Sequence, residues 1–171
     1  MTQLAFIVRA SRALARLMPA MFLLASIGAC SNGDAGNATG PSDPSSEVFA
    51  SALGVNLANM RELASRLYVQ DILVGSGAEA TAGKTLRVRY TGWLRTGQEF
   101  DSNRSAGAPF AFTLGAGRVI AGWDIGVAGM RVGGKRRLVL GSEYGYGAQG
   151  SGDIPPHATL VFDVELVSIA N

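Results

Sequence analysis

The amino-acid sequence predicts an α+β fold, in which one antiparallel sheet carries a single short helix on one face. Three observations lead to this prediction. Apolar and polar residues alternate in several segments between residues 67 and 169, as is typical of strands that are wet on one side. One segment, 119–130, has helical spacing instead. The chain also has 23 glycines among 171 residues, which favours tight turns over long helices.

Five segments are predicted to form strands. One of them, LRVRYTG, is a clear case because Leu86, Val88 and Tyr90 alternate with two arginines. In the last strand the apolar residues share one face, which places Asp163 and Glu165 on the opposite face. The five segments are LYVQDILV (67–74), LRVRYTG (86–92), PFAFTLG (109–115), KRRLVLG (135–141) and TLVFDVELVSI (159–169).

The helix is predicted over VIAGWDIGVAGM, residues 119–130, where Gly122, Gly126 and Gly129 recur at i, i+4 and i+7. A stripe of glycines lets a helix lie close to a sheet, although each glycine costs roughly 1 kcal/mol in helix propensity. We therefore expect this helix to lie directly against the sheet. The three basic residues 135–137, which open the strand that follows, are interpreted as a solvated edge of the sheet.

The part of the chain before residue 68 is predicted to be separate from the main domain, which spans 68–171. Residues 47–67 are interpreted as an N-terminal extension. Within it NLANMRELASRL (56–67) allows a short helix, with one apolar stripe made of Leu57, Met60, Leu63 and Leu67. Two roles stay open for the extension, since it could lengthen the sheet or mediate pairing of two chains.

The first 29 residues are predicted to be a lipoprotein signal peptide. Three arginines precede an apolar run of 13 residues, which is shorter than the about 20 residues needed to span a membrane. The run ends in IGAC, which resembles a bacterial lipobox, so Cys30 is the expected lipidation site. The alternative is an ordinary secretory signal followed by a chance cysteine. Residues 30–46 are rich in Gly, Ser and Pro and are expected to be a flexible tether.

This interpretation predicts a protein of the bacterial cell envelope that meets the membrane only through its lipid anchor. Ser31 follows the cysteine, instead of the aspartate that resembles an inner-membrane retention signal. In a Gram-negative host the protein is therefore expected at the outer membrane, facing the periplasm.

Charge and composition exclude several classes of function. Without the three signal-peptide arginines, 12 basic and 13 acidic residues remain, a formal charge of −1, so nucleic acid is not an expected partner. Cys30 is the only cysteine, and His157 is the only histidine and is interpreted as structural. This shortage argues against a metal site or a Cys–His nucleophile. The segment GMRVGGKR resembles a phosphate-binding loop, but Arg136 replaces its Ser or Thr. We therefore expect no metal and no cofactor.

Four stretches of the chain carry a family resemblance. They are VRYTGWLRTGQEFDS, PFAFTLGAGRVIAGWDIGVAGMRVGGKRRLVL, YGYGAQG and IPPHATLVFDVEL. In this order and with nearly this spacing they are similar to the FKBP-type peptidyl-prolyl cis-trans isomerases. The likeness runs from about residue 68 to 169. It implies a strongly bent antiparallel sheet wrapped around one short helix, with a pocket between them.

The resemblance also implies a function and a site. Proline-containing polypeptides are the expected partners, and macrolide-type inhibitors are expected to bind the same pocket. Asp101 would lie at the rim, while the Tyr146 hydroxyl and the Ile120 backbone N–H would hold substrate carbonyls. The walls would be Tyr90, Phe100, Phe110, Val119, Ile154 and Phe162, with the Trp123 indole as the floor.

The expected reaction needs no nucleophile. Resonance keeps the X-Pro amide planar, with a rotation barrier of ~18–20 kcal/mol. Because the planar amide is more polar than the twisted one, an apolar pocket favours the twisted form. Two functions stay open: an isomerase that assists the folding of envelope proteins, or a proline-peptide-binding module or holdase chaperone with little turnover.

The sequence departs from the family at the rim of this pocket. Many relatives have an arginine where this chain has Ala106, and that arginine often pairs with the rim acid. Here Arg104 is the nearest arginine in the sequence that could pair with Asp101.

Overall fold

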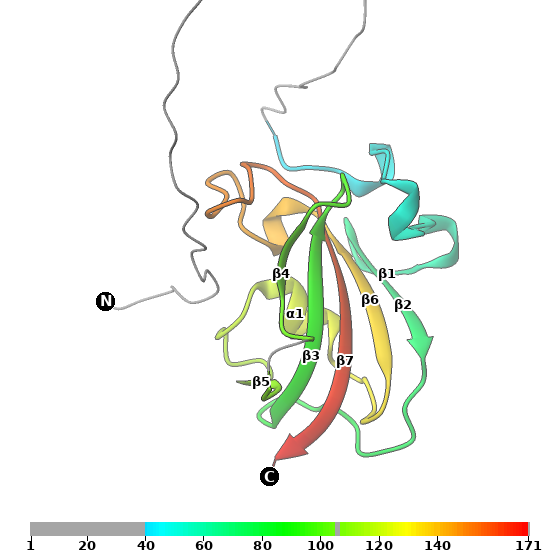
Figure 1. The fold of residues 1–171 in the computed structure, drawn as a ribbon, viewed down its shortest axis with the longest axis vertical. Helices are drawn as coiled ribbons and strands as arrows, with labels where there is room; N and C mark the ends of the chain where they lie inside the picture. The colour runs from blue at the N-terminus through cyan, green and yellow to red at the C-terminus, as the bar shows by residue number, and fades with distance from the viewer. Residues whose placement is uncertain (1–39, 105–106, 171) are drawn as a thin grey trace, which may run out of the picture.

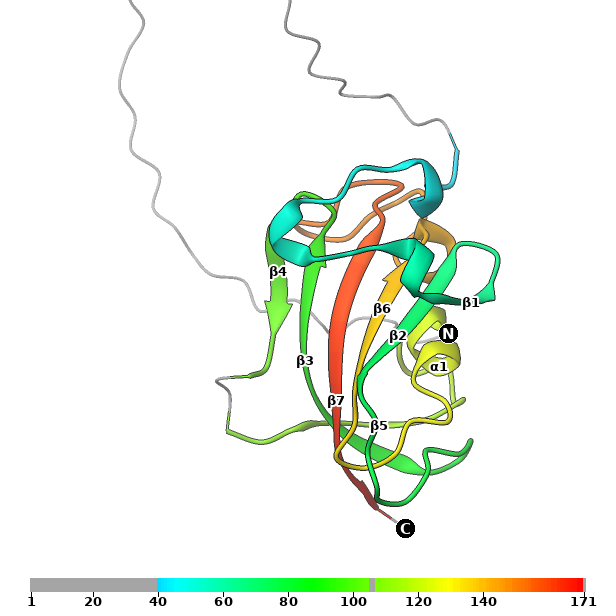
Figure 2. The same cartoon turned by 90° about the vertical axis from the view of Figure 1, so that its right-hand side faces the viewer.

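The structure is a computed structural model that describes residues 40–104 and 107–170. One antiparallel sheet of seven strands forms its centre, and one short helix, α1 (Ala121–Gly126), lies beside it (Figures 1 and 2). The sheet order is β1-β2-β6-β7-β3-β4, and β5 pairs with β3. The predicted α+β class is thereby confirmed. The strands are β1 (Arg61–Ala64), β2 (Leu67–Leu73), β3 (Thr85–Leu94), β4 (Glu99–Ser102), β5 (Phe110–Thr113), β6 (Lys135–Leu140) and β7 (Leu160–Ala170).

Two glycines let α1 lie close to the sheet, as the sequence predicted. An ideal Cβ atom at Gly122 would lie 2.6 Å from Leu140 Cδ1, and one at Gly126 would lie 2.8 Å from Leu138 Cδ2. Both leucines are on β6 and are fully buried. The helix is shorter than the predicted 119–130, because Gly129 adopts φ +76 and lies beyond its end. The glycine stripe therefore has two members in the helix instead of three.

Residues 42–60, which we call the strap, cover one end of the opposite face of the sheet. Leu53 of the strap forms a second apolar cluster with Val139 and Val161, which alternate along β6 and β7 with residues of the main core. The strap contains three short 3₁₀ turns, η1 (Pro44–Ser46), η2 (Ser51–Leu53) and η3 (Leu57–Asn59). In both views this blue-to-cyan segment crosses one end of the sheet (Figures 1 and 2).

The prediction of a helix within residues 56–67 is wrong. The Asn56 side chain accepts a hydrogen bond from the Ala58 N–H and caps η3, and the chain then extends into β1, which pairs with β2. The physical reason lies in the apolar stripe, whose members pack on two different faces. Leu57 and Met60 pack against the second apolar cluster, that of Leu53, whereas Leu63 packs against the main core. Of the two open roles, lengthening the sheet is the one the structure shows.

The interpretation of residues 135–137 as a solvated edge is also wrong, because β6 lies inside the sheet between β2 and β7. Arg136 is only 5% exposed. Arg137 Nε donates to Asp163 Oδ1 at 2.7 Å, and Lys135 Nζ lies 3.2 Å from Asp163 Oδ2. Asp163 is itself only 5% exposed, since the strap covers its face of the sheet and the Leu53 carbonyl accepts a hydrogen bond from Arg137. Lys135, Arg137 and Asp163 form a structural ion-pair network on the strap side of the sheet, with Asp163 as its buried centre.

The predicted signal peptide and Cys30 lie outside the described residues. Among the residues that are described, none belongs to a helix with the length and apolar character that crossing a membrane requires. The predicted lipid anchor therefore stays a prediction.

Candidate active site

A recess of about 260 Å³, partly open to solvent, lies between α1 and the sheet. The structure thus brings together seven of the ten residues that the sequence predicted for a substrate pocket. They come from β4, from the segment leading into α1, from α1 itself, from the loop after β6 and from β7. These residues are Phe100, Asp101, Val119, Ile120, Trp123, Tyr146 and Phe162.

The other three predicted residues do not line the recess. Tyr90 and Phe110 pack around Trp123, with ring centroids 5.0 and 6.3 Å from the indole. Ile154 is 7% exposed and belongs to the main core. Tyr90 and Phe110 thus help to fix the position of the indole, whereas Ile154 is part of the core and does not line the recess.

The floor of the recess is the Trp123 indole, which is 2% exposed. Tyr90 and Phe162 meet it edge to face, at interplanar angles of 84° and 85°. Such aromatic pairs contribute about 0.5–1.5 kcal/mol each beyond the area they bury, so the indole is rigidly held. In the described part of the chain its N–H has no hydrogen-bond partner.

A glycine in β3 makes room for the aromatic walls. An ideal Cβ at Gly92 would lie 2.7 Å from both Phe100 Cζ and Phe162 Cε1. The two rings meet edge to face with centroids 5.5 Å apart, directly over this glycine. Sequence reasoning missed this role, although a glycine inside a strand is a known signal of close approach.

The acid at the rim is held by a tyrosine. The Tyr90 hydroxyl donates a hydrogen bond to Asp101 Oδ2 at 2.7 Å. Burial, followed by the hydrogen bond to Asp101, raises the pKa of Tyr90 far above its ordinary value. Tyr90 therefore remains a protonated donor at neutral pH and fixes the carboxylate in one orientation. Sequence reasoning placed Tyr90 in the wall but did not find this bond.

Arg104 does not replace the arginine that many relatives place near the rim acid. Its guanidinium lies 3.9 Å from Asp163 Oδ2 and 5.6 Å from the centre of the Trp93 ring. No hydrogen bond or ion pair joins it to Asp101 in the described part of the chain. The hydroxyl of Tyr90 is the partner of Asp101 instead.

Two hydrogen-bond donors on residues that line the recess have no acceptor among the described residues. One is the Tyr146 hydroxyl, and the other is the backbone N–H of Ile120, the residue that precedes α1 with φ −59 and ψ 146. Burial, and then the charge of Asp101, raises the pKa of Tyr146, so that its hydroxyl keeps its proton. Two unpaired donors beside an apolar floor can hold the carbonyl oxygens of an extended peptide.

The segment that presents Ile120 is tied to the helix it precedes. The Asp124 carboxylate of α1 accepts hydrogen bonds from the Gly115 and Gly117 N–H groups, at 2.8 and 3.0 Å. Val119 and Ile120 lie between these anchored points. Their position at the recess is therefore set by the helix and not by a free loop.

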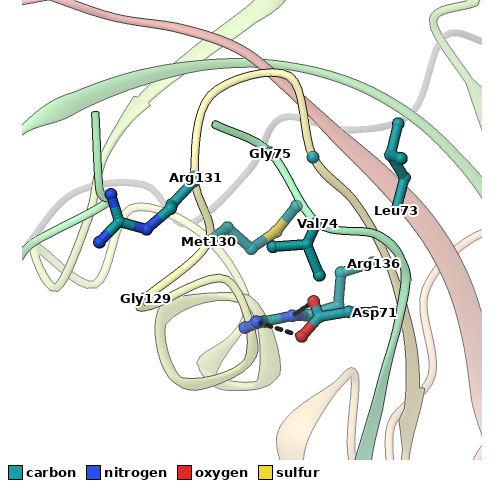
Figure 3. Close-up of a pocket in the computed structure, with 9 residues that line it drawn as sticks. Asp71, Leu73, Val74, Gly75, Gly129, Met130, Arg131 and Arg136 are labelled. Carbon is teal, nitrogen blue, oxygen red and sulfur yellow. Dashed lines mark hydrogen bonds and ion pairs between the residues drawn. The ribbon is translucent and has the colours of Figure 1, made fainter. Parts of the chain in front are cut away.

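A second recess, about 320 Å³ in volume, lies between the end of β2 and the loop after α1 (Figure 3). Its charged groups already have partners. Arg136 binds Asp71 through two hydrogen bonds of 2.6 and 3.1 Å, and it donates to the carbonyl oxygens of Gly126 and Ala128 at the end of α1. We interpret this arrangement as a structural ion pair that caps the helix. The smaller, more apolar recess is the candidate site.

No cluster of His, Cys, Asp and Glu suited to a metal ion occurs within residues 40–104 and 107–170. The candidate site itself offers aromatic rings, two donors without an acceptor in the described part of the chain and the carboxylate of Asp101, which Tyr90 orients.

Comparisons with known proteins indicate one family. The family model described as FKBP-type peptidyl-prolyl cis-trans isomerase matches residues 77–167. An FK506-binding protein of Neisseria meningitidis serogroup A is 53% identical over 104 residues, which cover 60% of this chain and 95% of the relative.

Two solved structures are similar as well. The crystal structure of a peptidyl-prolyl cis-trans isomerase from Pseudomonas syringae pv. tomato has a TM-score of 0.59 and 36% identity, with 66% of this chain and 82% of that one covered. FkpA from Escherichia coli has a TM-score of 0.60 and 38% identity, with coverages of 65% and 51%. Since the matched region includes α1 and every residue of the recess, the chain belongs to the FKBP-type peptidyl-prolyl cis-trans isomerase family.

Proposed function

We propose that this isomerase binds an extended X-Pro segment with the proline ring over the Trp123 indole and stabilises the twisted amide. One observation carries the proposal: an apolar recess is lined by Tyr146 and Ile120, and the Tyr146 hydroxyl and the Ile120 N–H have no acceptor in the described part of the chain. An extended peptide brings carbonyl oxygens that match them. The aromatic floor and walls supply the apolar surface that a proline ring prefers.

The catalytic effect follows from the difference in polarity between the planar and the twisted amide. Rotation has to overcome a barrier of ~18–20 kcal/mol because resonance keeps the amide planar. An apolar recess that excludes water disfavours the more polar planar form, and donors at the carbonyl oxygens hold the chain on both sides of the rotating bond. Asp101, oriented by Tyr90, acts electrostatically at the substrate carbonyl. No proton is transferred in this mechanism.

A paired experiment on Asp101→Val and Tyr146→Phe tests the proposal. Both substitutions are nearly isosteric, so we expect the fold to be kept. Each removes a group that acts more strongly on the twisted amide, so kcat/KM should fall, and a tenfold loss corresponds to ~1.4 kcal/mol of transition-state stabilisation. Tyr144→Phe is the matched control, since Tyr144 lies two residues from Tyr146 and does not line the recess.

The same variants separate catalysis from simple holding of unfolded chains. Isomerisation of a short X-Pro peptide and aggregation of an unfolded client are measured side by side. In a holdase the affinity comes from apolar area, so both substitutions would leave the suppression of aggregation intact. Loss of isomerisation with holding retained supports the catalytic mechanism. A wild type that holds clients but does not isomerise would refute it.

We further propose that the protein is a lipoprotein of the bacterial envelope that assists the folding of envelope proteins. The support is in the sequence: a short apolar run after three arginines, the lipobox-like IGAC and a tether poor in apolar residues. Lipid on Cys30 would hold the protein at the outer membrane, facing the periplasm. Cys30→Ser should release the protein from membranes or leave it unprocessed. An unchanged membrane fraction in this variant would rule out the anchor.

We also propose that the recess takes a macrolide-type ligand. The support is the name of the Neisseria meningitidis relative, which describes that protein as FK506-binding. If the ligand occupies the same floor, it should inhibit isomerisation competitively with an X-Pro peptide. Inhibition that does not depend on the peptide concentration would place the ligand elsewhere.

A further inference from the structure

Two serines that lie 100 residues apart bind each other in a reciprocal pair. The Ser42 N–H of the strap donates to Ser142 Oγ at 3.2 Å, and the Ser142 N–H donates to Ser42 Oγ at 3.0 Å. Ser42 is 5% exposed and Ser142 is 1% exposed. Each backbone donor is therefore buried and has the other serine's side chain as its acceptor. Removing one hydroxyl leaves a buried N–H without a partner.

Ser142 in turn fixes the loop that carries Tyr146. Its carbonyl oxygen accepts hydrogen bonds from the N–H groups of Gly145 at 3.0 Å and Gly147 at 2.8 Å, the two residues that flank Tyr146. Gly147 adopts φ +62, which completes a sharp turn at this point. The position of the Tyr146 hydroxyl thus depends on where the Ser142 backbone is held.

The strap and the start of this loop are in close contact. An ideal Cβ at Gly141 would lie 3.1 Å from the Ser42 carbonyl oxygen of the strap. The Gly141 N–H also donates at 2.8 Å to the carbonyl of Arg66, which lies outside the strap between β1 and β2. The serine pair joins this loop to the strap, and the Gly141–Arg66 hydrogen bond joins it to the turn before β2.

We propose that Ser42 is a positioning residue for catalysis, which holds the Tyr146 hydroxyl in register with the Ile120 N–H through Ser142. This inference rests on the proposed role of Tyr146 as a donor to substrate. Substrate affinity comes mainly from the apolar floor and walls, which the strap does not touch through this pair. Opening the pair therefore lowers kcat more than it changes KM.

The kinetic test uses the full chain with Ser42→Ala, Ser142→Ala and the double variant. Ser142→Ala breaks the same pair from the loop side, so the test does not depend on one variant. We expect kcat for a short X-Pro peptide to fall roughly tenfold in either single variant, with little change in KM. Because both act through one pair, the double variant should be no slower than the slower single variant. Ser46→Ala, on the exposed part of the strap, is the matched control and should behave like wild type.

A second readout does not depend on activity. Amide hydrogen exchange, measured by NMR, should rise at Gly145 and Gly147 in Ser42→Ala but stay unchanged at Ala50, whose N–H binds the Arg95 carbonyl elsewhere in the strap. An equal rise at Ala50 would mean that the whole strap detaches, and it would overturn the proposal. An unchanged kcat together with a lowered thermal midpoint in Ser42→Ala would also overturn the proposal. The same holds if the losses of kcat in Ser42→Ala and Ser142→Ala multiply in the double variant.

The two proposals fail in different ways. If the wild type does not isomerise, the proposed function fails, and the exchange rates at Gly145 and Gly147 still decide whether Ser42 holds the loop. If the wild type isomerises and Ser42→Ala is as fast as Ser46→Ala, only the role of Ser42 is refuted.

Discussion

A methyl group at position 92 should displace the two aromatic walls of the recess. Gly92 pairs with Asp101 on β4 and with Phe162 on β7. A Cβ there would lie 2.7 Å from Phe100 Cζ and Phe162 Cε1, whereas carbon atoms in contact prefer about 3.5–4.0 Å. Each ring would therefore have to withdraw by roughly 1 Å. Because the rings also touch each other, they cannot both move without changing the shape of the recess.

The expected cost of Gly92→Ala can be worked out from two opposing effects. Overpacking of this kind typically destabilises a protein by about 1–3 kcal/mol. Replacing a glycine inside a strand by alanine recovers roughly 0.5–1 kcal/mol. The net loss should be on the order of 0–2.5 kcal/mol, so the variant should fold. The displaced walls should raise KM about tenfold, while the donors at Tyr146 and Ile120 keep their places and kcat changes little.

Steady-state isomerisation of an X-Pro peptide, together with thermal unfolding, checks this expectation. Phe100→Leu in the Gly92→Ala background removes a ring edge, so it should recover part of the lost stability. Gly40→Ala is the control, since no atom lies within 4 Å of a Cβ at that position. If Gly92→Ala changes neither KM nor the thermal midpoint, the two rings do not form the wall of the binding site.

Three further predictions follow from the site and the buried charges. Trp123→Ala should lower the free energy of unfolding in urea by about 3–5 kcal/mol, because it leaves a cavity. Trp123→Phe should lower it clearly less, because the phenyl ring leaves a smaller cavity, and both variants remove the unpaired buried indole N–H. Burial opposes ionisation of Asp163, but its hydrogen bonds and charge interactions with Arg137 and Lys135 prevail and lower its pKa. The stability that ionised Asp163 contributes is therefore fully present above its unfolded-state pKa of about 3.9 and is lost as the pH falls through its lower folded-state pKa. Asp163→Asn should therefore make the urea midpoint of unfolding depend less on acid pH. The rate constant kcat/KM should be nearly flat between about pH 6 and 8, because no group is proposed to move a proton, and a bell-shaped profile would contradict this.

Sequence patterns predicted the long strands well because their alternation is dictated by one buried face. Leu86, Val88 and Tyr90 are buried as expected. The short strand β4 was missed, since four residues after a turn offer no window of alternation and Glu99–Ser102 becomes a strand by pairing with β3. Tertiary contacts also decided the fate of 56–67, where an apolar stripe suited to a helix is divided between two faces of the sheet.

The candidate site was reached through resemblance, and its polar contacts were not predictable from spacing. Arg104 is three residues from Asp101 in the sequence, yet its guanidinium lies near Asp163 and the Trp93 ring. The Tyr90–Asp101 bond depends on how β3 and β4 pair, and local sequence does not encode that register. The Ser42–Ser142 pair joins residues 100 positions apart, so no local pattern could reveal it.

If Cys30 carries lipid as proposed, the position at which the strap begins limits the distance between the recess and the membrane. The strap starts at Ser42, which is bound to the base of the loop that carries Tyr146. Ser42 is twelve positions after Cys30, and a fully extended chain of that length spans at most about 40 Å. If Cys30 carries lipid as proposed, the recess works inside a layer a few nanometres deep beside the bilayer. Its effective concentration is high for chains that cross this layer and negligible for all others, so location would select its clients more strongly than their sequence does.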